Sequence, residues 1–157
     1  MKIDYYLVET PEAAADLGDV IKNVSESANN ENRNISINGK PIRLQTAALE
    51  GSFWVGDMVK IRMDGIPPKT RLNGEQADID LDEDEGLGEE TAFVYDPATK
   101  ILCIQRNRYA VSAQGLARYF SKHYHPEYIE LKPVLKHDAL LRMDKLGVHR
   151  KLEGYVS

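Results

Sequence analysis

The chain has 157 residues, of which 42% are hydrophobic and 29% charged, which suits one globular domain and excludes a disordered chain. Its formal net charge of −5 is unevenly distributed, because residues 1–99 carry 9 Lys/Arg and 20 Asp/Glu while residues 100–157 carry 11 and 5. The resulting balances of −11 and +6 favour a polyanion-binding basic face, or a surface that pairs with its opposite on another copy.

The cysteine content and the hydropathy indicate the compartment. The one cysteine, Cys103, can form no internal disulfide, and it lies in the apolar run Ile101–Ile104, where we expect a buried thiol. No window approaches the roughly 18 apolar residues of a membrane span, and the N-terminus has no long apolar segment. We therefore expect a cytoplasmic protein that has no membrane partner.

The first part of the chain predicts a strand, a helix and a hairpin. The strand covers Ile3–Glu9, and Thr10-Pro11-Glu12 has the form of a helix start with Thr10 as the N-cap residue. Asn38-Gly39 lies between two alternating apolar runs and predicts a hairpin closed by a type I′ turn. Phe53–Met63 alternates in the manner of a strand with one wet face.

The later elements complete an α+β pattern, in which a largely antiparallel sheet has two or three helices packed on one side. We expect one domain over residues 1–157, and the strand-like Lys151–Ser157 leaves open that this is the N-terminal piece of a longer chain. The expected elements are a loop Asp64–Gln76, an acidic loop Asp78–Glu90, strands Thr91–Asp96 and Lys100–Gln105, a helix from Ser112 to about Tyr124, a strand Tyr128–Leu135, a helix Asp138–Leu146 and a strand Val148–Val156.

The acidic segment at residues 78–89 has the spacing of a calcium loop in part. Acids occupy loop positions 1, 3, 5 and 12, but position 6, which requires glycine for its sharp turn, is Glu83. We therefore expect a solvent-exposed acidic segment that binds no metal tightly. A surface that repels or mimics nucleic acid is the alternative interpretation of these carboxylates.

Two further patterns bear on catalysis, and neither is complete. Glu130-Leu131-Lys132 matches the Glu-x-Lys end of metal-dependent nucleases, but the nearest upstream aspartate, Asp96, lies in a predicted turn. The four histidines have no cysteine beside them to complete a zinc set, so we expect surface or polyanion-facing side chains; they are His123, His125, His137 and His149. We predict no cofactor and no enzymatic activity.

The basic residues of the C-terminal third form a more coherent set. The helix that begins at Ser112 buries one face and exposes the other, and its N-terminus can itself donate to phosphate. An ordinary solvated basic face is the alternative to a surface that contacts DNA phosphates irrespective of sequence. The candidate nucleic-acid-binding residues are Arg106, Arg108, Arg118 and Lys122, extended by Lys132 and Lys136.

One part of the chain also carries a family resemblance. Asp84-Glu85-Gly86-Leu87-Gly88 is followed by the strands Ala92–Tyr95 and Ile101–Gln105 and by the helix Ser112–Phe120. In the order of its elements this segment of about 40 residues resembles the prophage exclusion protein RexA and a wider set of phage-defence-type bacterial proteins. The resemblance implies a cytoplasmic protein that dimerises, binds DNA without strong sequence preference and acts through a protein partner. It supplies no catalytic residues.

Our leading hypothesis is a non-enzymatic nucleic-acid-binding module of a prophage or anti-phage defence system, which contacts the DNA backbone and forms a homo-oligomer, expected to be a dimer. The alternative is a protein-interaction or oligomerisation domain that pairs the acidic front of one copy with the basic rear of another. A metal-dependent nuclease is the third and least favoured class.

Overall fold

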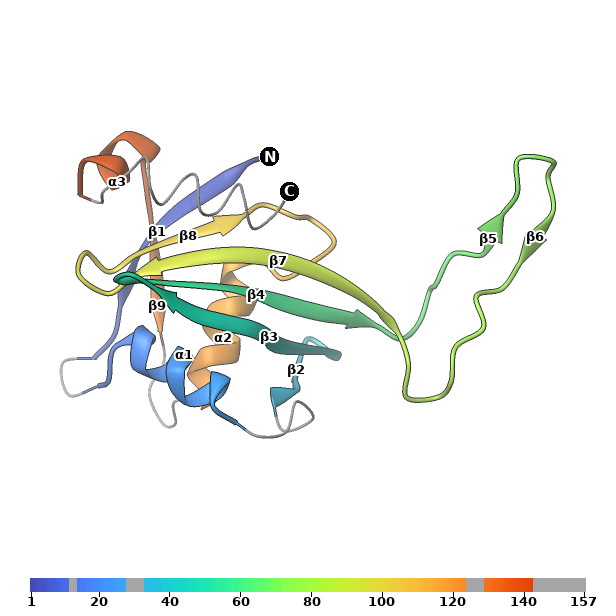
Figure 1. Ribbon diagram of the computed structural model, residues 1–157, viewed down its shortest axis with the longest axis horizontal. Coiled ribbons are helices and arrows are strands. Elements are labelled where there is room, and N and C mark those ends of the chain that lie inside the picture. Colours follow the sequence, from blue (N-terminus) through green and yellow to red (C-terminus); the bar gives the residue numbers. More distant parts are fainter. Residues whose placement is uncertain (12–13, 28–32, 124–128, 143–157) are drawn as a thin grey trace.

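A seven-stranded sheet in the order β2-β3-β4-β7-β8-β1-β9 forms the centre of the computed structural model, which describes residues 1–11, 14–27, 33–123 and 129–142 (Figure 1). Every neighbouring pair of these strands is antiparallel. The strands are β1 Ile3–Glu9, β2 Ile35–Ile37, β3 Lys40–Glu50, β4 Phe53–Arg62, β7 Leu87–Asp96, β8 Ile101–Gln105 and β9 Glu130–Val134. The helices are α1 Leu17–Ser25, α2 Ala113–His123 and α3 Lys136–Arg142.

The sheet has a core on each face because its central strands are apolar on both sides. In β7, Phe93 and Tyr95 belong to the cluster that also contains the buried residues of α1 and α2. Their neighbours Ala92 and Val94 belong to the opposite cluster, together with Ala139 of α3. The predicted α+β class is confirmed, with α1 and α2 packed on one face and α3 on the other.

Two local predictions are confirmed in detail. Asn38 and Gly39 have φ values of 52° and 77°, as a type I′ turn requires, and they join β2 to β3. Ser112 caps α2, because its Oγ accepts a hydrogen bond of 3.0 Å from the backbone N–H of Gly115. The predicted hairpin over residues 91–105 is present as β7 and β8, and β7 begins earlier, at Leu87.

The predicted start of the first helix is wrong. The N-cap residue of α1 is Asp16, whose Oδ2 accepts a hydrogen bond of 2.8 Å from Gly18 N–H. The other carboxylate oxygen accepts a bond of 2.7 Å from the hydroxyl of Tyr95 and forms an ion pair with Lys100. Asp16 therefore caps the helix and also bonds it to Tyr95 and Lys100 of the β7–β8 hairpin. These long-range contacts favour Asp16 over Thr10 as the cap.

Residues 63–86 form an arm that leaves the sheet between β4 and β7 (Figure 1). The sequence predicts only loop here, but the arm contains a two-stranded ribbon, β5 (Lys69–Thr70) paired with β6 (Gln76–Ala77). The acidic segment 78–85 lies in this arm and is largely exposed, as expected. Residues 87–90, expected as the end of the acidic loop, instead form the start of β7.

The remaining expectations are met in part or lie outside the described residues. β9 lies within the predicted strand Tyr128–Leu135, and α3 begins at Lys136, two residues before the expected start. Tyr124, the end of the predicted third helix and the strand Val148–Val156 fall outside the described residues.

Within the described ranges, no helix is both long enough and apolar enough to cross a membrane. The single-domain assignment stays a prediction.

Candidate nucleic-acid interface

Two of the six predicted basic residues lie on one surface, the exposed side of α2. Arg118 Nη1 donates to Asn38 Oδ1 at 3.3 Å, and Lys122 Nζ donates to the carbonyl of Ser36 at 3.1 Å. Both contacts reach the β2–β3 hairpin, which forms one edge of the sheet. α2 packs over this part of the sheet. The cationic groups are therefore held at the junction between the helix and the edge of the sheet.

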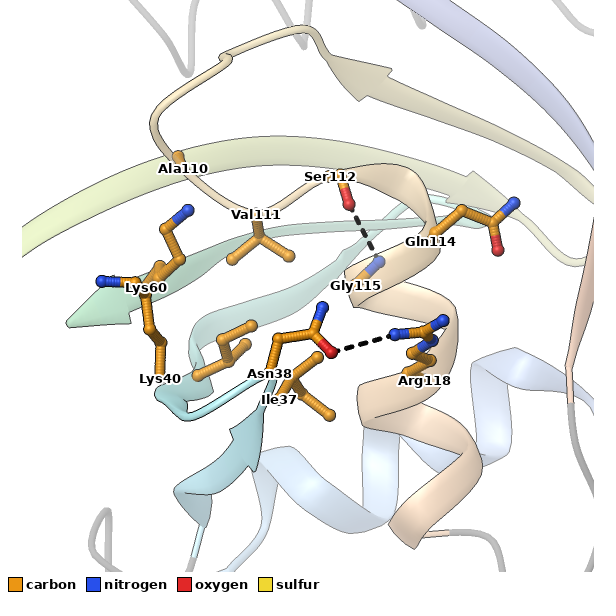
Figure 2. A pocket seen from close by; sticks show the side chains of 11 residues that line it. Ile37, Asn38, Lys40, Lys60, Ala110, Val111, Ser112, Gln114, Gly115 and Arg118 are labelled. Atoms are coloured by element: carbon orange, nitrogen blue, oxygen red, sulfur yellow. Dashed lines mark hydrogen bonds between the residues drawn. The ribbon is translucent and has the colours of Figure 1, made fainter. Parts of the chain in front are cut away.

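A pocket of about 400 Å³ opens at this junction, between the start of α2 and strands β2, β3 and β4 (Figure 2). Three of its lining side chains are cationic: Lys40 at the start of β3, Lys60 near the end of β4, and Arg118 on α2. Among the residues that the structure describes, no carboxylate lines it. The other lining residues are Ile37, Asn38, Ile42, Ala110, Val111, Ser112, Gln114 and Gly115. We call this feature the basic pocket.

Strand pairing explains why the two lysines reach the same pocket. Ile42 pairs directly with Lys60 across the β3–β4 ladder, so the two side chains project from the same face. Ile42 belongs to the core beneath α2, which fixes that face as the helical one. Because side chains alternate along a strand, Lys40 projects to the same side as Ile42.

A buried threonine fixes the segment that enters α2. The Thr91 hydroxyl donates to the carbonyl of Val111 and accepts from the N–H of the same residue, both at 3.1 Å. Thr91 is fully buried in β7, so this pair of bonds holds the backbone before Ser112 against the sheet. The first turn of α2, whose backbone N–H groups carry partial positive charge, thereby lines the basic pocket.

The carboxylates nearest to the basic pocket are already paired with cations. Glu89 lies opposite Lys60 in the β4–β7 ladder, but its Oε1 contacts Arg62 Nη2 at 2.9 Å. Lys40 Nζ lies 3.4 Å from Asp64, an ion pair between largely exposed groups that contributes little stability. Among the described residues Lys60 forms no ion pair, so the pocket retains a positive balance.

Arg106 and Arg108 do not line the basic pocket, and each has a local partner. Arg106 pairs with Asp4, with Nε and Oδ2 2.9 Å apart, and the bond to the guanidinium lowers the pKa of the Asp4 carboxyl. The guanidinium carbon of Arg108 lies 5.1 Å from the centre of the Tyr109 ring, so this arginine stacks locally.

Lys132 and Lys136 are also separate from α2. Lys132 lies on β9, the edge strand at the opposite end of the sheet from β2, where its Nζ contacts Glu9 at 2.9 Å. Lys136 begins α3, the helix on the opposite face. The expected extension of the basic patch by Lys132 and Lys136 is therefore not found, because β9 pairs with β1 at the far edge of the sheet and α3 lies on the opposite face.

The sequence argument missed Lys40 and Lys60, since both lie in the half of the chain that is acidic overall. A signal for each is present locally. Lys40 follows the Asn-Gly turn, and Lys60 alternates with the apolar Val59 and Ile61 on a strand. The sequence does not show that α2 packs over this part of the sheet. This packing brings Lys40 and Lys60 together with Arg118 in one pocket.

The structure gives little support to catalytic or metal chemistry elsewhere. Exposed carboxylates of Asp82, Asp84 and Glu85 have oxygens within 4.8 Å of one another, and they form the only such acidic, histidine or cysteine group among the described residues. Glu130 lies on β9 outside that group, and Lys132 beside it is held by Glu9. The absence of tight metal binding stays a prediction.

The histidines are placed only in part. The His123 ring centre lies 4.7 Å from that of Tyr119, and partial burial lowers the pKa of the imidazole. His137 is exposed on α3, and His125 and His149 lie outside the described residues. Neither described histidine lines the basic pocket.

The fold and the pocket together define an α+β domain that carries a small cationic pocket on the helical face of an antiparallel sheet. The chain belongs to DUF6731, a family of unknown function, whose model matches residues 5–155. No curated protein and no solved structure gives a significant match. The family match provides no link to RexA or to phage-defence proteins, so that resemblance stays a prediction.

Proposed function

We propose that this protein is a non-enzymatic nucleic-acid-binding module that contacts phosphates of the backbone through the basic pocket. The observation that carries the proposal is the convergence of Lys40, Lys60 and Arg118, from three separate elements, on a pocket that no carboxylate of the described residues lines. Side chains of like charge repel one another, so a site that gathers three cations is best stabilised by a bound anion.

The size and chemistry of the basic pocket favour a phosphate group of a polymer. A volume of about 400 Å³ is at the small end of ligand sites, and it would accept a phosphate with part of its sugar. Lysine supplies a point charge to phosphate, and the arginine fork can donate two parallel hydrogen bonds. Lys122 continues the cationic surface one turn along α2 from Arg118, in the direction that a second phosphate could occupy.

The same arrangement explains why little sequence preference is expected. Contacts to phosphate position a protein on nucleic acid but do not read the bases. The acidic arm begins beside the pocket, where Asp64 pairs with Lys40, and it would repel a second stretch of backbone. This repulsion would orient the polymer across the α2 face. A cytoplasmic location and a prophage or anti-phage setting remain part of the proposal and are supported by the sequence alone.

Replacing two pocket cations should weaken nucleic-acid binding strongly. We expect Lys60→Gln/Arg118→Gln to lower the affinity for a labelled duplex about 30-fold at low salt, since each lost phosphate contact costs about 1 kcal/mol. Fluorescence anisotropy measures the affinity for duplexes of two unrelated sequences and for a single strand of equal length. The loss should be about the same for both duplex sequences.

A matched control separates the pocket from bulk charge. Arg106→Gln/Lys132→Gln removes the same two charges from outside the basic pocket, and its affinity should stay within about threefold of wild type. The proposal fails if neither wild type nor a variant without residues 63–86 binds at low salt, or if the control loses as much affinity as the pocket variant. Unfolding curves of both variants confirm that each retains its fold.

A further inference from the structure

The arm, residues 63–86, is the part of the structure least explained by the chain itself. None of its residues is buried, and Leu72 at its far end is fully exposed. Its only regular structure is the two-residue pairing of β5 with β6, although an isolated two-stranded ribbon is marginally stable at best in water. An arm without a core of its own would be stabilised by docking on an external surface.

The charge of the arm restricts what that surface can be. The arm contains 8 Asp/Glu and 2 Lys/Arg, a balance of −6, and six of the acids fall within residues 78–85. A surface that holds it must therefore be cationic. The basic pocket with its neighbour Lys122 is such a surface, and it lies on the same chain.

The arm does not lie on the basic pocket of its own chain. It leaves the sheet after Arg62 and extends away from the sheet and its helices (Figure 1). Only its base touches the rim of the pocket, through the ion pair of Asp64 with Lys40. The acidic residues farther along are thus available to another molecule.

We propose that the arm of one copy docks across the α2 face of a second copy, with its acidic segment 78–85 against Lys40, Lys60, Arg118 and Lys122. The arm and the pocket lie at the same end of β4, since only Ile61 and Arg62 separate Lys60 from the arm. Two copies related by a two-fold axis can therefore exchange arms reciprocally, so that both pockets are filled and the assembly closes as a dimer.

This inference uses the same basic surface as the proposed function, but it does not require nucleic acid. Where both hold, the arm of the second copy and a nucleic-acid backbone compete for the cations of the basic pocket. The dimer would then be the form with low nucleic-acid affinity. Assembly is therefore tested without nucleic acid, and nucleic-acid binding is measured separately.

The strand pairing at the base of the arm allows a variant in which the arm is deleted and the sheet is kept. Arg62 and Leu87 are directly paired across β4 and β7, so residues 63–86 can be replaced by an Asn-Gly type I′ turn. Sedimentation velocity at low salt should show a dimer for wild type and a monomer for this armless variant. A monomeric wild type at micromolar concentrations, or a dimeric armless variant, would overturn the proposal.

A charge exchange tests the specific docking surface. One variant carries Lys40→Glu/Lys60→Glu/Arg118→Glu, and the other has all six acids of segment 78–85 replaced by lysine, which changes the charge of the arm from −6 to +6. Each variant alone has an arm and a pocket of like charge and should be monomeric. Their mixture restores opposite charges at both contacts, so a heterodimer should form with at least a tenfold tighter dissociation constant than either homodimer.

The outcomes also separate this inference from the proposed function. If both are correct, the armless variant is monomeric and binds the labelled duplex at least as tightly as wild type. If it is monomeric and binds no nucleic acid, arm docking stands and the proposed function fails. If the charge-exchanged pair does not associate, the docking proposal is wrong, whatever the nucleic-acid result.

Discussion

Replacing Asp16 with alanine should lower the free energy of unfolding by about 3 kcal/mol. The substitution removes the N-cap of α1 and the acceptor of the Tyr95 hydroxyl, which lie 2.8 and 2.7 Å from its two carboxylate oxygens. A lost cap costs about 1 kcal/mol, and a buried hydroxyl left without an acceptor costs about 1 to 3 kcal/mol. Burial and the bond to Asp16 raise the pKa of Tyr95, so its hydroxyl stays protonated as a donor. Urea denaturation measures the change.

Two further variants identify the cause of that loss. Asp16→Asn keeps one oxygen that accepts from Gly18 N–H, and its amide NH2 can donate to the Tyr95 hydroxyl, which then accepts instead of donating. The variant also loses the charge facing Lys100, so it should cost about 1 kcal/mol. In the Asp16→Ala background, Tyr95→Phe removes the stranded hydroxyl and should be nearly neutral. Equal losses for the alanine and asparagine variants would show that the hydrogen bonds of Asp16 do not matter.

A second large effect is expected at Arg33, a nearly buried arginine. Its guanidinium donates to four backbone carbonyls, with lengths of 2.7 and 3.0 Å to Ser25 and Ser27 and 3.4 and 3.5 Å to Gln45 and Leu44. These bonds join the end of α1 to β3 at the register shift between Leu44 and Thr46. Arg33→Met fills similar space but strands the carbonyls, so we expect a loss of about 3 kcal/mol in urea denaturation.

The matched control for Arg33 is an arginine that is exposed on the arm. Arg71 has 79% of its side chain exposed and forms only a long contact of 3.7 Å with Glu75. We expect Arg71→Met to change the free energy of unfolding by less than about 0.5 kcal/mol. If Arg33→Met is no more destabilising than Arg71→Met, the four carbonyl contacts do not stabilise the fold.

Features determined by a few neighbouring residues could be predicted from the sequence. The turn at Asn38-Gly39 requires positive φ at two successive positions, and few other residue pairs accept that conformation. The hairpin at residues 91–105 and the cap at Ser112 likewise depend on short patterns. Arg118 and Lys122 were found because the helical period separates the core face of α2 from its exposed face.

Features determined by packing between distant segments could not be predicted. Asp16 became the cap because Tyr95 and Lys100, about 80 residues later, contact the same carboxylate. Lys60 entered the site because α2 packs over its strand, which no local pattern shows. The regional charge places Lys132 in the basic third of the chain, but it does not show that β9 pairs at the far edge of the sheet.

The salt dependence of duplex binding tests the central claim most directly. Binding through three or four cationic contacts to phosphate should give a linear fall of log affinity against log salt, with a slope of about −3. The Lys60→Gln/Arg118→Gln variant should have a slope closer to zero by about two units, and Arg106→Gln/Lys132→Gln should keep the wild-type slope within about half a unit. An affinity that does not change with salt, or a pocket variant with the wild-type slope, would contradict phosphate binding in the basic pocket.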